Sequence, residues 1–171
     1  CDGFFFKDKE IAVVGGGDSA LEEALFLTTY ASKVYLIHRR DSLRASDIMQ
    51  QRVFDNPKIE VLWNSVVSEI HGDSKLEEVV LTDTVTGATR DMKLDGLFIA
   101  IGSDPRIEMV KDQLEITDQN TIAVQGRSSK TSLPGVFAAG DVIDPTYRQA
   151  IIAAGSGAVA ALDAQHYLEN L

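Results

Sequence analysis

Three small residues at fixed spacing follow a short apolar run near the start of the sequence. Gly15, Gly17 and Ala20 form the pattern Gly-x-Gly-x-x-Ala directly after the apolar residues 11–14. In such a pattern the first glycine makes a tight turn, the second lets a pyrophosphate approach the backbone, and the third residue lets a helix pack closely on a strand. The start of that helix also favours phosphate charge. The motif predicts a dinucleotide-binding loop, with a plain glycine-rich turn as the alternative.

A cluster of positive charge follows about 20 residues later. His38, Arg39 and Arg40 stand where NAD-binding proteins usually carry an acid that holds the ribose 2′-hydroxyl, and Arg44 lies four residues further on. Guanidinium groups bind a 2′-phosphate through charge-assisted hydrogen bonds, so the cluster favours NADP over NAD. A solvated charge run is the alternative. Asp41 can be read as the NAD-type acid, although a cap or a salt bridge suits its position better.

A second candidate site lies in the last third of the chain. An apolar run ends in Gly140 and Asp141, and Arg148, Gln149 and Ala150 open a helix of small residues. Asp141 can accept hydrogen bonds from a polyol, but from the residues alone we expect it to cap the following helix. That helix contains two glycines, which cost about 1 kcal/mol each relative to alanine and therefore suggest a close neighbour.

Periodicity and turn residues predict the elements that position these sites. Strands are expected at residues 10–14, 34–38, 59–63 and 97–102, the last buried because it is fully apolar, and helices at 20–31 and 45–54. Asp18 and Ser19 are expected to supply N-cap oxygens to the first helix. Short strands at 66–70, 76–82 and 90–94 predict an antiparallel meander beside a parallel βαβ sheet.

A domain boundary is predicted after Gly102, where Ser-Asp-Pro breaks regular structure. Residues 103–171 should contain a short polar helix, strands at 121–124 and 135–139, and a long helix from about 147 to 168. The fold class is therefore α/β. Residues 1–102 form a Rossmann-like three-layer nucleotide-binding domain with an antiparallel β-meander, and residues 103–171 form part of a second α/β domain.

Composition narrows the function classes. The 171 residues carry a net charge of −10, and a chain this acidic lacks the basic footprint of a nucleic-acid-binding protein. No apolar run approaches the length that spans a bilayer. The one cysteine, Cys1, cannot form an internal disulfide, and the composition suits a reducing, cytoplasmic compartment. Taken alone, Cys1 is read as a structural cysteine beside an arbitrary chain start.

Together these motifs resemble one family. Cys-Asp-Gly-Phe-Phe at the start, Gly-Gly-Gly-Asp-Ser-Ala-x-Glu-Glu-Ala, Ile-His-Arg-Arg-Asp, and Pro-Gly-Val-Phe-Ala-Ala-Gly-Asp-Val followed by Arg-Gln-Ala resemble low-molecular-weight, bacterial-type thioredoxin reductase. The resemblance runs over the whole chain, in order. It implies that the chain corresponds to the C-terminal portion of such an enzyme, without the N-terminal FAD-binding segment.

The resemblance also implies residue roles. Cys1 matches the second cysteine of the redox-active Cys-x-x-Cys pair, and Asp2 matches the acid that moves protons during dithiol exchange. The residues expected to bind NADPH are Gly15, Gly17, Asp18, Ser19, Ala20, His38, Arg39, Arg40 and Arg44. Asp141 matches the residue that holds the FAD ribityl chain, and Arg148, Gln149 and Ala150 line the flavin ring. Ile101, Gly102 and Gly140 complete the expected cofactor-binding residues, and no metal site is expected.

The implied reaction passes a hydride from NADPH to FAD, then electrons to the disulfide, and then to thioredoxin by thiol–disulfide exchange. The NADPH-binding domain at 1–102 and the FAD-binding domain, of which 103–171 is the C-terminal part, would rotate about a hinge, and the full-length enzyme would be a homodimer. Because the first cysteine of the pair is not in the sequence, the isolated chain is expected to bind NADPH but to have little reductase activity.

Three other readings remain. The flavoprotein of the alkyl hydroperoxide reductase system is similar but uses NADH and lacks the His-Arg-Arg cluster. The thioredoxin-reductase-like ferredoxin–NADP reductases lack the redox cysteines, so Cys1 and Asp2 count against them. A non-catalytic NADP-binding module would be a protein whose intact chain starts near Cys1.

Overall fold

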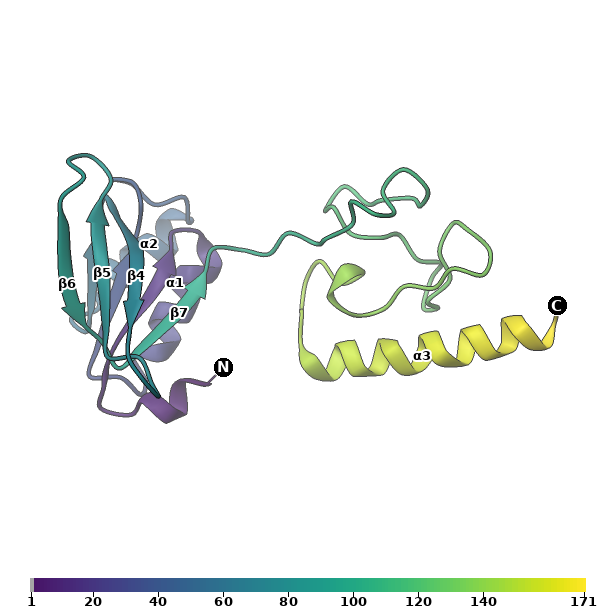
Figure 1. The fold of residues 1–171 in the computed structure, drawn as a ribbon, viewed down its shortest axis with the longest axis horizontal. Coiled ribbons are helices and arrows are strands. Elements are labelled where there is room, and N and C mark those ends of the chain that lie inside the picture. Colours follow the sequence, from purple (N-terminus) through teal and green to yellow (C-terminus); the bar gives the residue numbers. More distant parts are fainter. Residues whose placement is uncertain (1) are drawn as a thin grey trace. The chain divides into compact units, whose positions relative to one another are not determined.

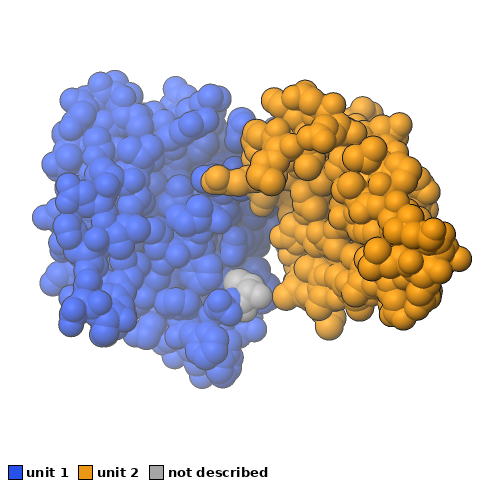
Figure 2. Space-filling view, turned by 45° about the vertical axis from the view of Figure 1, so that its right-hand side comes forward, with its two compact units in different colours: residues 1–102 blue, residues 103–171 orange. Residues whose placement is uncertain are grey.

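The computed structural model describes residues 2–171, and Cys1, expected to be a redox cysteine, lies outside the described residues. The chain divides into two compact units, Cys1–Gly102 and Ser103–Leu171 (Figure 2). Asp2 is exposed and begins a short 3₁₀ helix, η1 (Asp2–Phe6).

A four-stranded parallel sheet forms the centre of the first unit (Figure 1). Its strands are β1 (Glu10–Gly15), β2 (Lys33–Ile37), β3 (Ile59–Leu62) and β7 (Gly96–Ala100), in the order β3-β2-β1-β7. The connecting helices are α1 (Asp18–Leu27) and α2 (Asp47–Phe54). The predicted βαβ unit is thereby confirmed, since β1 and β2 pair in parallel on either side of α1 in the sequence.

The predicted meander is confirmed as a separate three-stranded antiparallel sheet. It consists of β4 (Ser65–His71), β5 (Glu78–Asp83) and β6 (Thr89–Lys93), paired in that order. Its turns lie at the glycine-containing segments that the sequence marks. Gly87, for example, has a φ of 74°, a conformation that glycine adopts without a steric cost.

Two apolar layers hold the first unit together, and the alternation along β1 assigns its residues to them. Ile11 and Val13 pack with Leu21 of α1, whereas Ala12 packs on the opposite face with Val79 and Leu81 of the meander. All six side chains are at most 1% exposed. The order of layers is therefore helices, parallel sheet, meander, which confirms the predicted three-layer α/β fold.

The burial of β7 differs from the expectation. Gly96 alone of its five residues is buried, and the side chain of Ile99 is 60% exposed. The strand is apolar throughout, but it lies at the edge of the sheet, where one side has no neighbouring strand within the described residues. An apolar run predicts a strand but not its position in the sheet.

The second unit has less regular structure than predicted. Its long helix is confirmed as α3 (Ala150–Glu169), preceded by a short 3₁₀ helix, η2 (Gly140–Val142). The strands predicted at 121–124 and 135–139 are wrong. Within the described chain these segments make only the single bridges Ile116–Ile122 and Lys130–Phe137, and their few backbone hydrogen bonds to neighbouring segments do not extend into a ladder.

One smaller expectation for this unit is also wrong, since the short polar helix after Gly102 is a series of turns around residues 108–113. Gly155 and Gly157 of α3 have no atom of residues 2–171 outside their own helix within 4 Å of the position that a Cβ would take. Their predicted close neighbour stays a prediction.

Candidate functional site

The glycine turn joins β1 to α1, and its three glycines have different surroundings. A Cβ on Gly15 would collide with the backbone of Ala100 and with Ala20, and one on Gly16 would collide with the ring of His38. These two glycines and Ala20 therefore allow close packing within the protein. A Cβ on Gly17 would meet no described atom within 4 Å. Gly17 is thus the glycine that leaves space beside the backbone at the start of α1, where a phosphate would bind.

The arginine loop, residues 38–46, connects β2 to α2 and is tied to the glycine turn by three links. His38 Nδ1 lies 3.0 Å from the carbonyl oxygen of Gly15, and the Arg44 N–H donates to the Gly16 oxygen at 2.7 Å. The backbone N–H and hydroxyl of Ser46 donate to Oδ1 of Asp18 at 2.9 and 2.8 Å. The predicted phosphate loop and the predicted arginine cluster therefore lie side by side.

The arginine side chains are available for a ligand. Arg39, Arg40 and Arg44 are exposed, and the ion pairs found in the described chain include none of them. Their backbone is fixed, however. The Thr84 hydroxyl donates to the Arg39 oxygen at 3.1 Å, and the Asn64 N–H donates to the Arg40 oxygen at 3.2 Å. Three guanidinium groups thus extend from an anchored backbone.

His38 occupies a different position from the arginines. It is only 5% exposed, and its Nε2 lies 2.9 Å from the Ser42 oxygen while Nδ1 faces Gly15. A neutral imidazole can donate from only one of its nitrogens. In this structure the ring joins the glycine turn to the arginine loop, and its predicted contact with a 2′-phosphate stays a prediction.

The role predicted for Asp18 and Ser19 as N-cap residues is wrong. Gly17 is the N-cap of α1 and makes no side-chain cap, and Asp18 lies in the first turn. The Asp18 carboxylate is instead directed to Ser46, whose backbone N–H and hydroxyl lower the pKa of that carboxyl. This role was missed because Ser46 lies 28 residues away.

The remaining predicted cofactor-binding residues of the first unit, Ile101 and Gly102, follow the carboxyl end of β7. Gly15 pairs with Ala100, so the carboxyl ends of β1 and β7 are adjacent, and Ile101 and Gly102 follow directly. Both are exposed, and Gly102 has a φ of 92° with no described atom within 4 Å of its Cβ position. In open α/β sheets ligands bind outside the carboxyl ends of the strands, at the point where the strand order reverses. Here that point lies at β1, which has β2 on one side and β7 on the other.

The second candidate site lies where η2 meets α3. The N–H of Gly140 donates to the Ser156 hydroxyl at 2.9 Å, which ties η2 to the helix. Asp141 is exposed and does not cap α3 as expected, since Gln149 is the N-cap. The Asp141 carboxylate makes no hydrogen bond within the described residues, so its oxygens are open to a ligand.

Asp144 is a structural residue of this site that sequence reasoning missed. Its carboxylate accepts the backbone N–H groups of Thr146, Tyr147 and Arg148 at 2.8–2.9 Å, and these bonds lower its pKa. Arg148 has a φ of 48°, in the left-handed region that a non-glycine residue rarely adopts. Asp144 therefore holds the turn 146–148, which leads into α3 and contains Arg148. The Asp-Pro-Thr sequence, typical of a turn, was the available signal.

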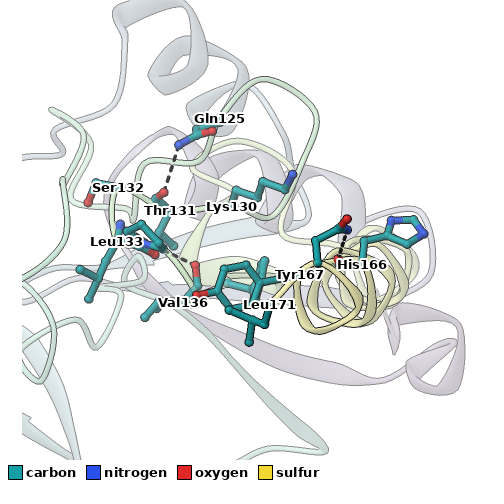
Figure 3. Close-up of a pocket in the computed structure, with 13 residues that line it drawn as sticks. Gln125, Lys130, Thr131, Ser132, Leu133, Val136, His166, Tyr167 and Leu171 are labelled. Atoms are coloured by element: carbon teal, nitrogen blue, oxygen red, sulfur yellow. Dashed lines mark hydrogen bonds between the residues drawn. The ribbon is translucent and has the colours of Figure 1, made fainter.

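A cavity of about 380 Å³ in the second unit contains none of the predicted site residues. It lies between the segment 130–137 and the end of α3, with Lys130, Leu133, Tyr167 and His166 among its lining (Figure 3). Gly135 lines it with a φ of 80°, and a Cβ there would lie 3.2 Å from the Tyr167 ring. The predicted sites are instead open surfaces at element ends.

Comparison with known proteins decides the family. The pattern of the pyridine nucleotide-disulphide oxidoreductases matches residues 1–157, most of the chain. The chain belongs to this family.

Several relatives within the family are named thioredoxin reductase. The chain is 58% identical over all of its residues to thioredoxin reductase from Streptomyces clavuligerus, covering 53% of that protein. It is 56% identical over 98% of its length to thioredoxin reductase from Mycolicibacterium smegmatis, covering 54% of it. It also superposes on the crystal structure of thioredoxin reductase from Streptococcus pyogenes with a TM-score of 0.86 and 47% identity, covering all of this chain and 56% of that one.

The chain spans about half the length of the curated relatives that it matches. No helix among residues 2–171 is both long and apolar enough to cross a membrane. Within the same residues no cluster of histidine, cysteine and acidic side chains could hold a metal ion.

Proposed function

We propose that this family member takes part in the reaction of an NADPH-dependent thioredoxin reductase, with NADPH bound by residues 1–102 and with residues 103–171 forming the C-terminal part of the FAD-binding domain. When bound, NADPH would supply a hydride and FAD would carry the electrons to a Cys-x-x-Cys disulfide, from which thioredoxin would receive them. The activity is proposed for a protein that contains both units, since the chain spans about half of its relatives.

The observation that carries the NADPH proposal is the anchored arginine loop beside the glycine turn. Gly17 leaves open space at the start of α1, and the Arg44 N–H donates to the Gly16 oxygen at 2.7 Å. A pyrophosphate at Gly17 would bring a ribose 2′-phosphate toward the exposed guanidinium groups of Arg39, Arg40 and Arg44. The residues present therefore fit NADPH. The pyrophosphate, which NADH also carries, would be held by the glycine turn alone.

The FAD proposal depends on the surface where η2 meets α3. The carboxylate of Asp141 is exposed and would accept hydrogen bonds from ribityl hydroxyls. Asp144 fixes the backbone of Arg148, whose side chain and that of Gln149 would line the flavin ring. The donor and acceptor types fit a polyol and a ring edge, and the resemblance assigns the same residues.

The remaining parts of the proposal come from the family. Cys1 would be one sulfur of the redox pair, and the exposed Asp2 would move the proton during dithiol exchange. Thioredoxin or a thioredoxin-like protein would be the partner. The relatives' shared name supports this, and we extend the proposal to a cytoplasmic homodimer.

Calorimetric titration with NADPH and NADH tests the proposal. The wild-type chain should bind NADPH at least about tenfold more tightly, and the double variant Arg39→Ala/Arg40→Ala should lose most of this preference, because each charged contact contributes about 1.5–3 kcal/mol. The backbone bonds of Thr84 and Asn64 remain in the double variant. Arg52→Ala, which removes an exposed charge from the end of α2, is the matched control and should bind as wild type. Equal affinity of the wild type for both nucleotides would refute the assignment.

A further inference from the structure

The three links between the arginine loop and the glycine turn differ in what the turn contributes. At two of them the acceptor is a backbone oxygen, of Gly15 or of Gly16. At the third it is the carboxylate of Asp18, whose Oδ1 receives both the backbone N–H and the hydroxyl of Ser46. Of the three links, this one depends on a side chain of the glycine turn, so substitution of Asp18 removes it.

Ser46 is the residue at which the loop ends and α2 begins. It is the N-cap of α2, and its own side chain makes no cap hydrogen bond. Asp18 thus holds the point where the backbone turns from loop into helix, two residues after Arg44. His38 is buried at the other end, so the loop is held at both ends. Arg39, Arg40 and Arg44 lie between these two fixed points.

We propose that Asp18 is a positioning residue that determines preference for a 2′-phosphorylated nucleotide by holding the arginine loop through Ser46. This inference rests on the proposed function, because the ligand is the 2′-phosphate of NADPH. Asp18 acts through its hydrogen bonds to Ser46 and not by contact with the nucleotide. It therefore affects NADPH, whose 2′-phosphate needs the arginines, more than NADH, which the glycine turn holds.

The sign of the effect distinguishes positioning from electrostatics. Asp18 is an exposed carboxylate next to Gly17, where the phosphates would bind. If its charge acted directly, removal would raise affinity, most strongly for the more highly charged NADPH. If Asp18 positions the loop, removal lowers the affinity for NADPH in spite of the lost repulsion. Asn keeps an acceptor oxygen for Ser46 but has no charge. The Asp18→Asn variant therefore separates the effect of the charge from the effect of the hydrogen bonds.

The test is calorimetric titration of the Asp18→Ala and Asp18→Asn variants with NADPH and with NADH. We expect Asp18→Ala to raise the NADPH Kd on the order of tenfold, and the NADH Kd less than about twofold. Asp18→Asn should bind NADPH within about twofold of wild type or more tightly. An unchanged or tighter NADPH complex of Asp18→Ala would overturn the proposal, as would equal losses for both nucleotides or a failure of Asn to rescue.

Asp163→Ala is the matched control. Asp163 accepts the backbone N–H and the hydroxyl of Ser129, both at 2.8 Å, so it repeats the bonding of Asp18 in the other unit. Its removal should leave the ratio of the NADPH and NADH affinities unchanged. A changed ratio would mean that loss of any such carboxylate alters binding, which would overturn the specific role of Asp18.

Hydrogen exchange separates this inference from the proposed function. The amides of Arg44 and Ser46 should exchange faster in Asp18→Ala than in wild type or Asp18→Asn, with no nucleotide present. If wild type shows no preference for NADPH, the proposed function fails, whatever the exchange data show. If wild type prefers NADPH but Asp18→Ala keeps both the slow exchange and the preference, only the role of Asp18 fails.

Discussion

Gly16 and Gly17 are neighbours in the glycine turn, and the structure predicts opposite consequences for replacing each with alanine. A Cβ on Gly16 would collide with the buried ring of His38, which is held between Gly15 and Ser42 and cannot move aside freely. Overpacking of this kind costs about 1–3 kcal/mol. For a unit of this size each kcal/mol corresponds to a fall in Tm of about 4–8 °C.

Gly17→Ala should leave the fold almost unchanged. The backbone of Gly17 has φ −100° and ψ 178°, which alanine adopts without strain, and no described atom lies within 4 Å of the new methyl group. Alanine is a poorer N-cap than glycine. It also stabilises the folded state by about 0.4–1 kcal/mol, because it lowers the conformational entropy of the unfolded chain. The two effects oppose each other, so the net change should stay within about 1 kcal/mol. The methyl group would, however, occupy the space that we assign to the pyrophosphate.

Thermal denaturation and calorimetric titration of both variants check this pair of expectations. Gly17→Ala should keep a Tm near that of wild type and lose at least about tenfold in affinity for NADPH and NADH alike, since both carry a pyrophosphate. Gly16→Ala should show the lower Tm. Wild-type affinity in Gly17→Ala would refute the placement of the phosphates. A Tm as low as that of Gly16→Ala would refute the argument from open space.

Two further predictions concern carboxylates. Asp18, Asp83, Asp144 and Asp163 accept backbone N–H groups, and these bonds hold the pKa of each carboxyl below its ordinary value. A lowered folded pKa contributes stability that is present above the unfolded pKa of about 3.9 and is lost as pH falls through the folded pKa. The Tm, followed by circular dichroism, should therefore fall below about pH 4, and an unchanged Tm down to pH 3 would contradict this. In the second unit, Asp144→Asn should keep the bonds from Thr146 and Tyr147 to Oδ1 but lose the one from Arg148 to Oδ2. Hydrogen exchange should then speed up at Arg148 alone, and at all three amides in Asp144→Ala. Uniform exchange in the two variants would count against the assignment of the bonds.

Local patterns predicted much of the first unit. The apolar runs gave β1, β2, β3 and β7, and the turn residues separated the three strands of the meander. Successive side chains of a strand point to opposite faces, so the structure places Ile11 and Val13 on one face of β1 and Ala12 on the other. Apolar runs and turn residues are local signals, so a short window of sequence contains the information that predicts these elements.

The second unit was harder to predict because composition predicts an extended segment but not the length of the ladder that the segment forms. The apolar residues 121–124 and 135–139 have the composition of strands, but they make one bridge each. A strand needs a neighbour that supplies a ladder, and composition does not reveal whether one is present. The exposure of Ile99 in β7 has the same origin, because the sequence does not specify which strand lies at the edge.

The sequence by itself determined the chemistry of the candidate nucleotide site. The spacing of Gly15, Gly17 and Ala20, and the arginines after β2, predicted a phosphate loop and a cationic cluster, because residue type and local spacing are sufficient for both. Only the tertiary structure decided how the two are joined. His38 is buried between them, and Asp18 reaches Ser46, 28 residues away, instead of capping its own helix. Such contacts exist only after folding brings the carboxyl ends of β1 and β2 to the same edge of the sheet.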